Sequence, residues 1–177
     1  MRTNGARYGL VSRGLHWSVA LLIIGLLWLG WYMADLSYYD RWSNVSLDWH
    51  KALGMLALLA GILKISWALG SHAPAPPPSR ARWERLSAHA MNLTLFAMMV
   101  AIPTTGYVIS TSAGDGIAIF GWFVVPALLP ESEALRDLAI ELHYYFAYGT
   151  AALVLVHVMA ALKHQFIDSD GTLSRMI

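Results

Sequence analysis

Histidine carries most of the metal-binding chemistry that this sequence offers, because the chain has seven histidines and no cysteine. The lack of cysteine excludes disulfides, thiolate-bound zinc, iron–sulfur clusters and haem attached through a C-x-x-C-H motif. His143, His157 and His164 all lie in the mostly apolar stretch of residues 140–166. An ionisable ring in hydrocarbon is unfavourable unless a partner satisfies it. These histidines are therefore predicted to have a function.

The elements that must position these rings are predicted to be membrane-spanning helices. Hydrophobic residues make up 57% of the 177-residue chain and charged residues only 13%, whereas soluble domains are about a quarter charged. The net charge of +1 gives no reason to expect a nucleic-acid partner. A spanning helix needs about 20 mostly apolar residues, and the segments that qualify are residues 14–34, 48–70, 86–110 and 137–166. The predicted fold class is all-α, a four-helix transmembrane bundle in contact with lipid that forms one domain over residues 1–177.

The connection between the third and fourth spans contains a second apolar run, GIAIFGWFVVPALLP. This run is too short and too interrupted to cross a bilayer. We expect it to lie at the interface or to fold back on the bundle, with Trp122 at the depth of the headgroups.

Basic residues predict the orientation of the spans, because cytoplasmic loops carry an excess of Lys and Arg. They cluster before the first span, between the second and third, and after the fourth, at Arg2, Arg7, Arg13, Arg80, Arg82, Arg85, Lys163 and Arg175. Most acidic residues lie on the other side. Both termini are therefore predicted to be cytoplasmic.

Helix geometry places four histidines at two depths. His143 and His157 are 14 residues apart, so they share a helix face and are separated by about 21 Å along the axis. His50 begins the second span near the depth of His143, and His16 lies in the first span near the depth of His157. Each depth thus receives two histidines from different helices.

Two imidazoles facing each other from different helices suit a metal centre, and bundle interiors are where such centres are built. The arrangement fits haem iron with two axial histidines, whereas structural zinc prefers four protein ligands. Alternatively, each histidine only hydrogen-bonds a neighbouring helix. His164 competes by depth with His157 for His16, or is an interfacial residue. His89 has the same two readings at the start of the third span: a solvated ring, or a donor to a quinone carbonyl or a haem propionate.

Three basic residues accompany these histidines. Arg13 and Lys51 are close in sequence to His16 and His50, so they are candidate propionate partners, or ordinary interfacial side chains that extend to the headgroups. Lys64 lies deeper in the second span, and its long stem is expected to reach toward the cytoplasmic headgroups.

Five short motifs resemble the bacterial cytochrome b561 family. They are RGLHW in the first span, WHKALG in the second, LSAHAMNL in the third, and LHYYFAYG and LVHVMAALKH in the fourth. The resemblance runs from about Tyr8 to Arg175, and the order and spacing of the motifs agree. It extends more distantly to the cytochrome b subunits of membrane hydrogenases and formate dehydrogenases.

The resemblance implies a multi-pass protein of the bacterial inner membrane that holds two b-type haems. The implied iron ligands are His16 with His157 and His50 with His143. Family members exchange electrons with quinone, and one bacterial member is a superoxide:ubiquinone oxidoreductase. The resemblance therefore implies an oxidoreductase of the respiratory type that takes electrons from an outer donor such as superoxide and passes them to ubiquinone. It also implies a homodimer.

Two other functions stay open at this point. A membrane-anchor subunit of a hydrogenase or dehydrogenase would use the same haems but would receive electrons from a partner protein. A non-haem transporter would use the histidines as a proton relay. The lack of Asp and Glu inside the spans weighs against the transporter.

Overall fold

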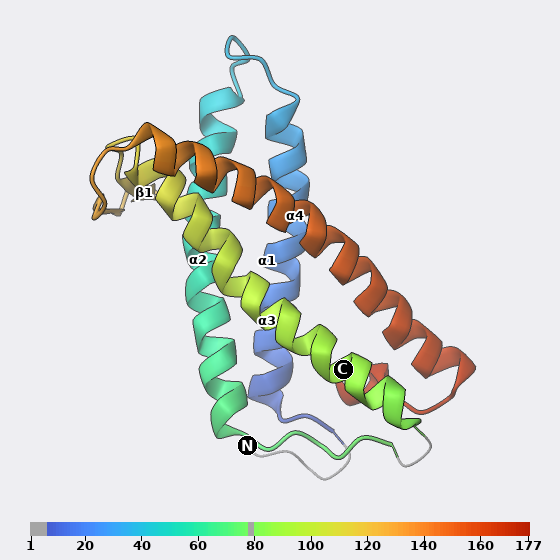
Figure 1. Cartoon of the computed structure of the whole chain (residues 1–177). Coiled ribbons are helices and arrows are strands. Elements are labelled where there is room, and N and C mark those ends of the chain that lie inside the picture. Colours follow the sequence, from blue (N-terminus) through green and yellow to red (C-terminus); the bar gives the residue numbers. More distant parts are fainter. Residues whose placement is uncertain (1–6, 78–79) are drawn as a thin grey trace.

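The computed structural model describes residues 7–77 and 80–177, so that Arg2, used above to predict orientation, lies outside the described residues. Four long helices dominate the fold, and a short β-hairpin and two helical turns complete it (Figure 1). The elements are α1 (Leu10–Ala34), α2 (Ser43–Gly70), α3 (Arg82–Thr111), β1 (Ile117–Ile119), β2 (Phe123–Val125), α4 (Glu133–Leu162), a π-helical turn (Lys163–Ile167) and a 3₁₀ turn (Leu173–Arg175).

The predicted all-α class with four spans is confirmed, since each long helix is long and apolar enough to cross a membrane. Each helix begins four to five residues before the predicted apolar segment, as α2 does at Ser43 and α4 at Glu133. The reason is that polar residues at a membrane surface continue a helix without being hydrophobic. A Ser132 hydroxyl, for example, accepts a hydrogen bond from the Leu135 N–H and so caps α4.

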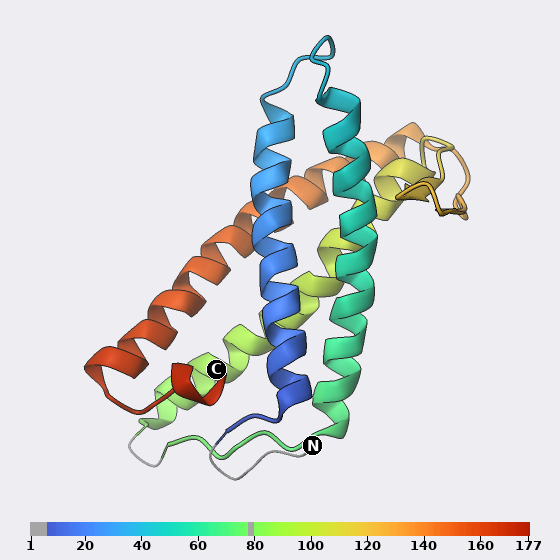
Figure 2. The same ribbon diagram turned by 180° about the vertical axis from the view of Figure 1, so that it is seen from behind.

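The helices pack as two crossed pairs. α1 lies along α2 and α3 lies along α4, and α2 also packs against α3. Figure 1 shows the α3–α4 pair crossing in front of the α1–α2 pair, and Figure 2 shows the same crossing from behind. Among the described residues, α4 has no comparably close backbone packing with α1 or α2. Contacts of α4 with α1 and α2 are therefore made mainly by side chains.

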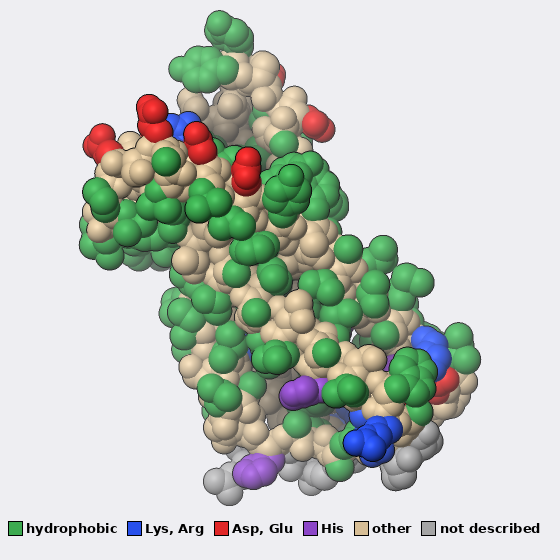
Figure 3. All heavy atoms as spheres, in the orientation of Figure 1, with side chains coloured by type: hydrophobic (Ala, Val, Ile, Leu, Met, Phe, Trp, Pro, Cys, Tyr) green, Lys and Arg blue, Asp and Glu red, His purple; other side chains and the backbone are tan. Residues whose placement is uncertain are grey.

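The buried core of the described residues is small for four long helices. Its apolar members are Val19, Ala52, Ala57, Met99, Ile117 and Ala139. Hydrophobic side chains instead cover much of the surface between a patch of acidic residues at the hairpin end and basic residues at the opposite end, where the first and last described residues lie (Figure 3). We call these the hairpin end and the termini end. The apolar surface between them matches a bilayer.

The apolar run between α3 and α4 folds back on the bundle as a β-hairpin, one of the two outcomes expected above. Ile117 pairs with Val125 and Ile119 with Phe123, and the turn between the strands contains Phe120 and Gly121 at positive φ. The Phe120 ring lies edge-on against Trp49 of α2, with the centroids 5.3 Å apart. The hairpin is thereby fixed beside the first turns of α2, next to His50.

The last ten residues, 168–177, form a strap across the termini end. Asp170 forms an ion pair with Arg80 of the α2–α3 linker at 2.8 Å, and their side chains are 3% and 13% exposed. The Gln165 side-chain oxygen accepts the backbone N–H groups of Leu173 and Ser174 at 3.0 and 3.2 Å. The strap ends on α1, where Trp17 donates its ring N–H to the Met176 carbonyl at 2.8 Å.

The ion pair of Asp170 predicts how the strap responds to mutation and pH. Burial alone would raise the pKa of Asp170, but hydrogen bonds from Thr172 and Arg80 outweigh it and lower the pKa below its ordinary value of 3.8. A lowered carboxyl pKa stabilises the folded state above pH 3.8, and the contribution is lost as the pH falls through the folded-state pKa.

We expect Asp170→Ala to release the strap at neutral pH, because it leaves the Arg80 charge buried without its partner, a change that costs about 3 kcal/mol or more in buried pairs. Limited proteolysis followed by mass spectrometry should show faster cleavage in residues 168–177, and acidification of the unmodified chain should have the same effect. The exposed Asp115 at the hairpin end provides the control variant Asp115→Ala. Equal cleavage of both variants would contradict this role of the ion pair.

Candidate cofactor site between the helices

The structure brings four of the predicted histidines together in two pairs. His50 of α2 and His143 of α4 form the hairpin-end pair, with ring centroids 6.1 Å apart and planes inclined by 72°. His16 of α1 and His157 of α4 form the termini-end pair, at 6.3 Å and 50°. All four rings are half-buried. Both pairs join α4 to the helices against which its backbone does not pack.

The spacing of the rings is suitable for one metal ion shared by each pair. An imidazole nitrogen binds a metal at about 2 Å, and the ring centre lies about 1 Å further, so two imidazoles on opposite sides of one ion have centroids about 6 Å apart. Both observed spacings are close to that value. Neither pair has a carboxylate or thiolate ligand beside it among the clusters found in the described residues. This donor set suits an ion whose remaining ligands come from a macrocycle rather than from protein.

α3 fixes the ring of His143. Its Nδ1 lies 3.1 Å from the Ile102 carbonyl oxygen and 3.0 Å from the Thr105 hydroxyl. Because a carbonyl oxygen only accepts, Nδ1 carries the proton, and the unprotonated Nε2 is left free to bind a metal. Thr105 also donates to the same carbonyl at 2.7 Å. This second contact holds the acceptor in place and so fixes the orientation of the ring.

The ring of His50 has an unpaired buried nitrogen. No described residue hydrogen-bonds its Nδ1, and leaving such a group unsatisfied costs about 1–3 kcal/mol. Gly30 of α1 makes room for the ring, since a Cβ at that position would lie 3.4 Å from Cε1 of His50. A buried polar atom kept without a protein partner is what a group bound between the helices would explain.

The bundle as a whole fits a large flat cofactor held by these rings. Protein interiors are normally close-packed, yet the buried core here is small and α4 stands off from α1 and α2. The ring spacing, the orphaned nitrogen of His50 and the separation of α4 all agree with a haem at such a position. The residues present therefore fit the group that the sequence resemblance implies.

The termini-end pair has a different environment from the hairpin-end pair. The Trp17 ring lies edge-on to His16 at 5.4 Å. Arg13 donates through Nη1 to the Ile177 carbonyl, while its Nε is buried without a partner. That free donor keeps Arg13 available as the predicted propionate partner. Lys51 is half-buried one residue after His50, and its role as a propionate partner stays a prediction.

His164 does not lie in the same helix as His157. It belongs to the π-helical turn after α4, and its Nδ1 lies 2.6 Å from Asp168 Oδ2. It joins an ion-pair network that extends along the termini end and consists of Arg80, Glu84, Lys163, His164, Asp168 and Asp170. His89 is exposed on α3.

Within this network, Glu84, His164 and Asp168 are close enough to hold a cation. The Lys163 ammonium already lies 2.9 Å from Glu84 and 2.7 Å from Asp168. It pairs with both carboxylates, so each of them already has a cationic partner without a metal.

The groups that orient the predicted histidines were not predicted from the sequence. Thr105 is an ordinary small polar residue in an apolar span. Only its position next to Gly106, on the helix that faces His143, could have indicated its role. Lys64 was expected to extend to the headgroups, whereas its ammonium lies 5.6 Å from the centre of the Phe96 ring, near the termini-end pair.

Comparison with known proteins gives matches along almost the whole chain. The model of a family described as prokaryotic cytochrome b561 matches residues 7–177. Cytochrome b561 homolog 2 of Escherichia coli K12 is 41% identical over 171 residues, covering 97% of this chain and 91% of that protein. Cytochrome b561 homolog 1 of the same organism is 27% identical over 168 residues, covering 92% of each chain. A probable superoxide oxidase, CybB of Yersinia pestis, is 24% identical over 176 residues, covering 97% and 96%.

Gly106 gives a test of how closely α3 supports the site. A Cβ there would lie 3.3 Å from Cε1 and 3.6 Å from Nδ1 of His143, a ring that cannot move without losing its hydrogen bonds. We expect Gly106→Ala to lower the thermal unfolding midpoint in detergent. The matched control is Gly149→Ala on α4, where nothing lies within 4 Å and the better helix propensity of Ala stabilises by about 0.5–1 kcal/mol. A midpoint for Gly106→Ala as high as that of the control would contradict the close fit.

Proposed function

Because the chain belongs to the prokaryotic cytochrome b561 family of membrane electron-transfer proteins, we propose that it moves electrons across a bacterial membrane by means of two haems. The observation that carries this proposal is the presence of two histidine pairs, one toward each end of the bundle. When bound, a haem with two histidine ligands supplies reversible one-electron redox chemistry and has no open position for oxygen chemistry.

In this proposal, residues of the chain bind the two haems and orient the histidines that hold them. His50 and His143 hold one haem, His16 and His157 hold the other, and Ile102 and Thr105 fix the tautomer of His143. Arg13 and Lys51 bind propionate groups by charge-assisted hydrogen bonds. The apolar exterior of the four helices keeps water away from both sites.

The distribution of charge supports an orientation with the termini end in the cytoplasm. Arg80, Arg82, Arg85, Lys163 and Arg175 all lie in the parts of the chain that meet at that end, and basic residues mark cytoplasmic segments. Acidic side chains gather at the hairpin end (Figure 3). The hairpin-end pair then lies toward the periplasmic side of the inner membrane.

The donor in this proposal is an outer reductant such as superoxide, and the acceptor is ubiquinone. The name of the Yersinia pestis relative, a probable superoxide oxidase, motivates the donor. Each superoxide anion gives one electron and leaves as O₂. One quinone takes two such electrons and two protons and leaves as quinol, so two superoxide anions balance one quinone.

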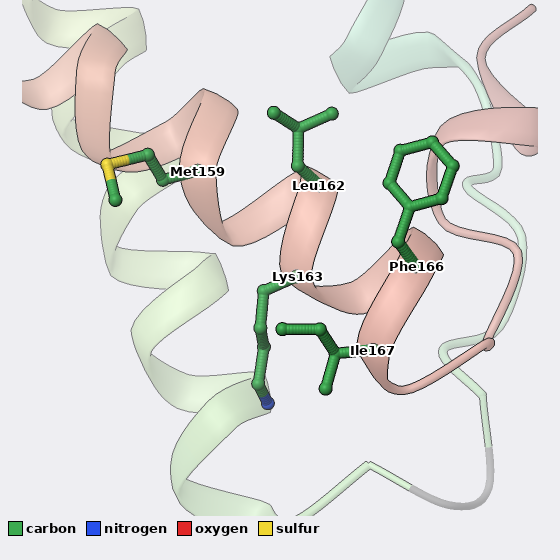
Figure 4. Close-up of a pocket in the computed structure, with 5 residues that line it drawn as sticks. All are labelled: Met159, Leu162, Lys163, Phe166 and Ile167. Carbon is green, nitrogen blue, oxygen red and sulfur yellow. The ribbon is translucent and has the colours of Figure 1, made fainter.

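The termini end offers suitable groups for the quinone. Figure 4 shows an apolar groove on the surface of α4 and the π-helical turn, lined by Met159, Leu162, Lys163, Phe166 and Ile167. His164 lies in the same π-helical turn, and its Nδ1 is 2.6 Å from Oδ2 of Asp168. In the proposal the groove receives the apolar part of a quinone from the bilayer, and His164, with His89 on α3, hydrogen-bonds its carbonyl oxygens.

We expect the loss of one histidine to remove one haem and to spare the other, because each pair is complete without the other pair. His50→Ala and His16→Ala should each lower the haem content from about two per chain to about one. The measurement is the haem-to-protein ratio with reduced-minus-oxidised spectra. His72→Ala, in the α2–α3 linker, is the control. Loss of both haems in either variant, or no b-type spectrum in the unmodified protein, would contradict the assignment.

Rapid-mixing spectroscopy tests the direction of transfer. We expect superoxide to reduce the haem of the anaerobic purified protein, and a soluble ubiquinone analogue to reoxidise it. His164→Gln should slow the reoxidation at least several-fold without changing the spectrum or the reduction rate, because it removes a donor near the groove and not a haem ligand. If superoxide leaves the haem oxidised, another donor must be sought. If reoxidation keeps its rate, His164 does not serve the quinone.

A further inference from the structure

Lys64 is an ionisable residue in the middle of the apolar part of α2. It lies 14 residues after His50, and only nonpolar and small polar residues separate it from Gly54 and Gly70 on either side. Its side chain is half-buried. Charged residues at such depth are unfavourable and are usually retained for a function. The proposed function described above gives Lys64 no role.

The position of Lys64 follows from the same helix geometry that pairs the histidines. Fourteen residues are close to four whole turns, so Lys64 shares a face with His50 and lies about 21 Å nearer the termini end. This is the relation that His157 has to His143 on α4. The face of α2 that presents His50 at one depth therefore presents Lys64 at the other.

The structure places the Lys64 charge beside the termini-end pair. Its ammonium acts electrostatically on both His16 and His157, and it lies 5.6 Å from the centre of the Phe96 ring of α3. All four helices thus contribute to this site. His50 in the hairpin-end pair receives no such influence from Lys51.

Lys64 has no anionic partner among the residues that the structure describes. The ion pairs among residues 7–77 and 80–177 do not include it, and contact with an aromatic face contributes only about 0.5–2 kcal/mol. A cation kept in a medium of low dielectric attracts negative charge strongly. The natural source of that charge is the site itself, when an electron resides there.

We propose that Lys64 is the counter-charge of the termini-end site, which stabilises an added electron there and so draws electrons from the hairpin-end site. The inference rests on the proposed electron-transfer function. The proposal requires a protonated lysine, which itself exchanges no electron. Its effect is a fixed positive potential, which favours the reduced state of a neighbouring centre and disfavours the oxidised state. The hairpin-end site lacks an equivalent charge on the same face.

The test is a redox titration of the haem-loaded protein, followed by absorption spectroscopy. The His50→Ala variant, which keeps only the termini-end site, assigns the two midpoints. We expect Lys64→Met to shift the one-electron equilibrium away from the termini-end site by at least tenfold, which is about 59 mV for a single electron. Lys64→Arg keeps the charge and should keep the midpoint. Arg82→Met removes a positive charge from the exposed start of α3 and is the control for a general change in net charge.

The outcomes separate this inference from the proposed function. If the unmodified protein shows no b-type haem, the proposed function fails. If it shows both haems but Lys64→Met leaves the midpoints in place, or Lys64→Arg shifts them equally, Lys64 is not the counter-charge. Should Lys64→Met fail to assemble, Lys64→Gln, which stays polar, is titrated against Lys64→Arg, and equal midpoints would overturn the inference in the same way.

Discussion

The fold depends on the contact of imidazole rings across a space that the helix backbones do not close. α4 packs along α3 and stands away from α1 and α2, so His143 and His157 must reach their partners from the far side of that space. In a bilayer there is no hydrophobic drive to bring helices together, and association relies on packing and polar contacts. A bundle with so small a buried core therefore gains stability from whatever binds between the rings. A cofactor bound there would consequently link its binding to folding.

α3 positions the hairpin-end pair, although neither histidine of that pair belongs to it. Its Ile102 carbonyl and Thr105 hydroxyl set the tautomer of His143, and Gly106 leaves space for the ring. Pro103 sits between these groups without ending the helix. Because Pro has no N–H, the Met99 carbonyl loses its usual helical partner, and Gly61 of α2 lies where a Cβ would be only 3.3 Å from that oxygen. The small Gly61 thus permits a close approach of α2 and α3.

Much of the site was predictable because a bilayer restricts the depth at which each residue of a spanning helix lies. Under that constraint, counting residues along a helix gives both height and face, and the histidines placed at equal depth by counting do meet in space. The hairpin, the strap and the partners of His143 were not predictable in this way. They depend on turns and on tertiary contacts at the ends of helices, where neither periodicity nor hydrophobicity restricts the chain. Lys64 shows the intermediate case, since its face followed from counting but its direction depended on Phe96.

His164 illustrates how a local change of helix type decides between two candidates. In a continuous α-helix, a residue seven positions after His157 would lie on nearly the same face. The chain instead widens into a π-helical turn from Lys163 to Ile167, and the extra residue in that turn alters the phase of everything that follows. Asp168 then lies one turn away, and its carboxylate accepts a hydrogen bond from Nδ1 of His164. His164 therefore belongs to the ion-pair network of the strap, whereas His157 faces His16 across the bundle.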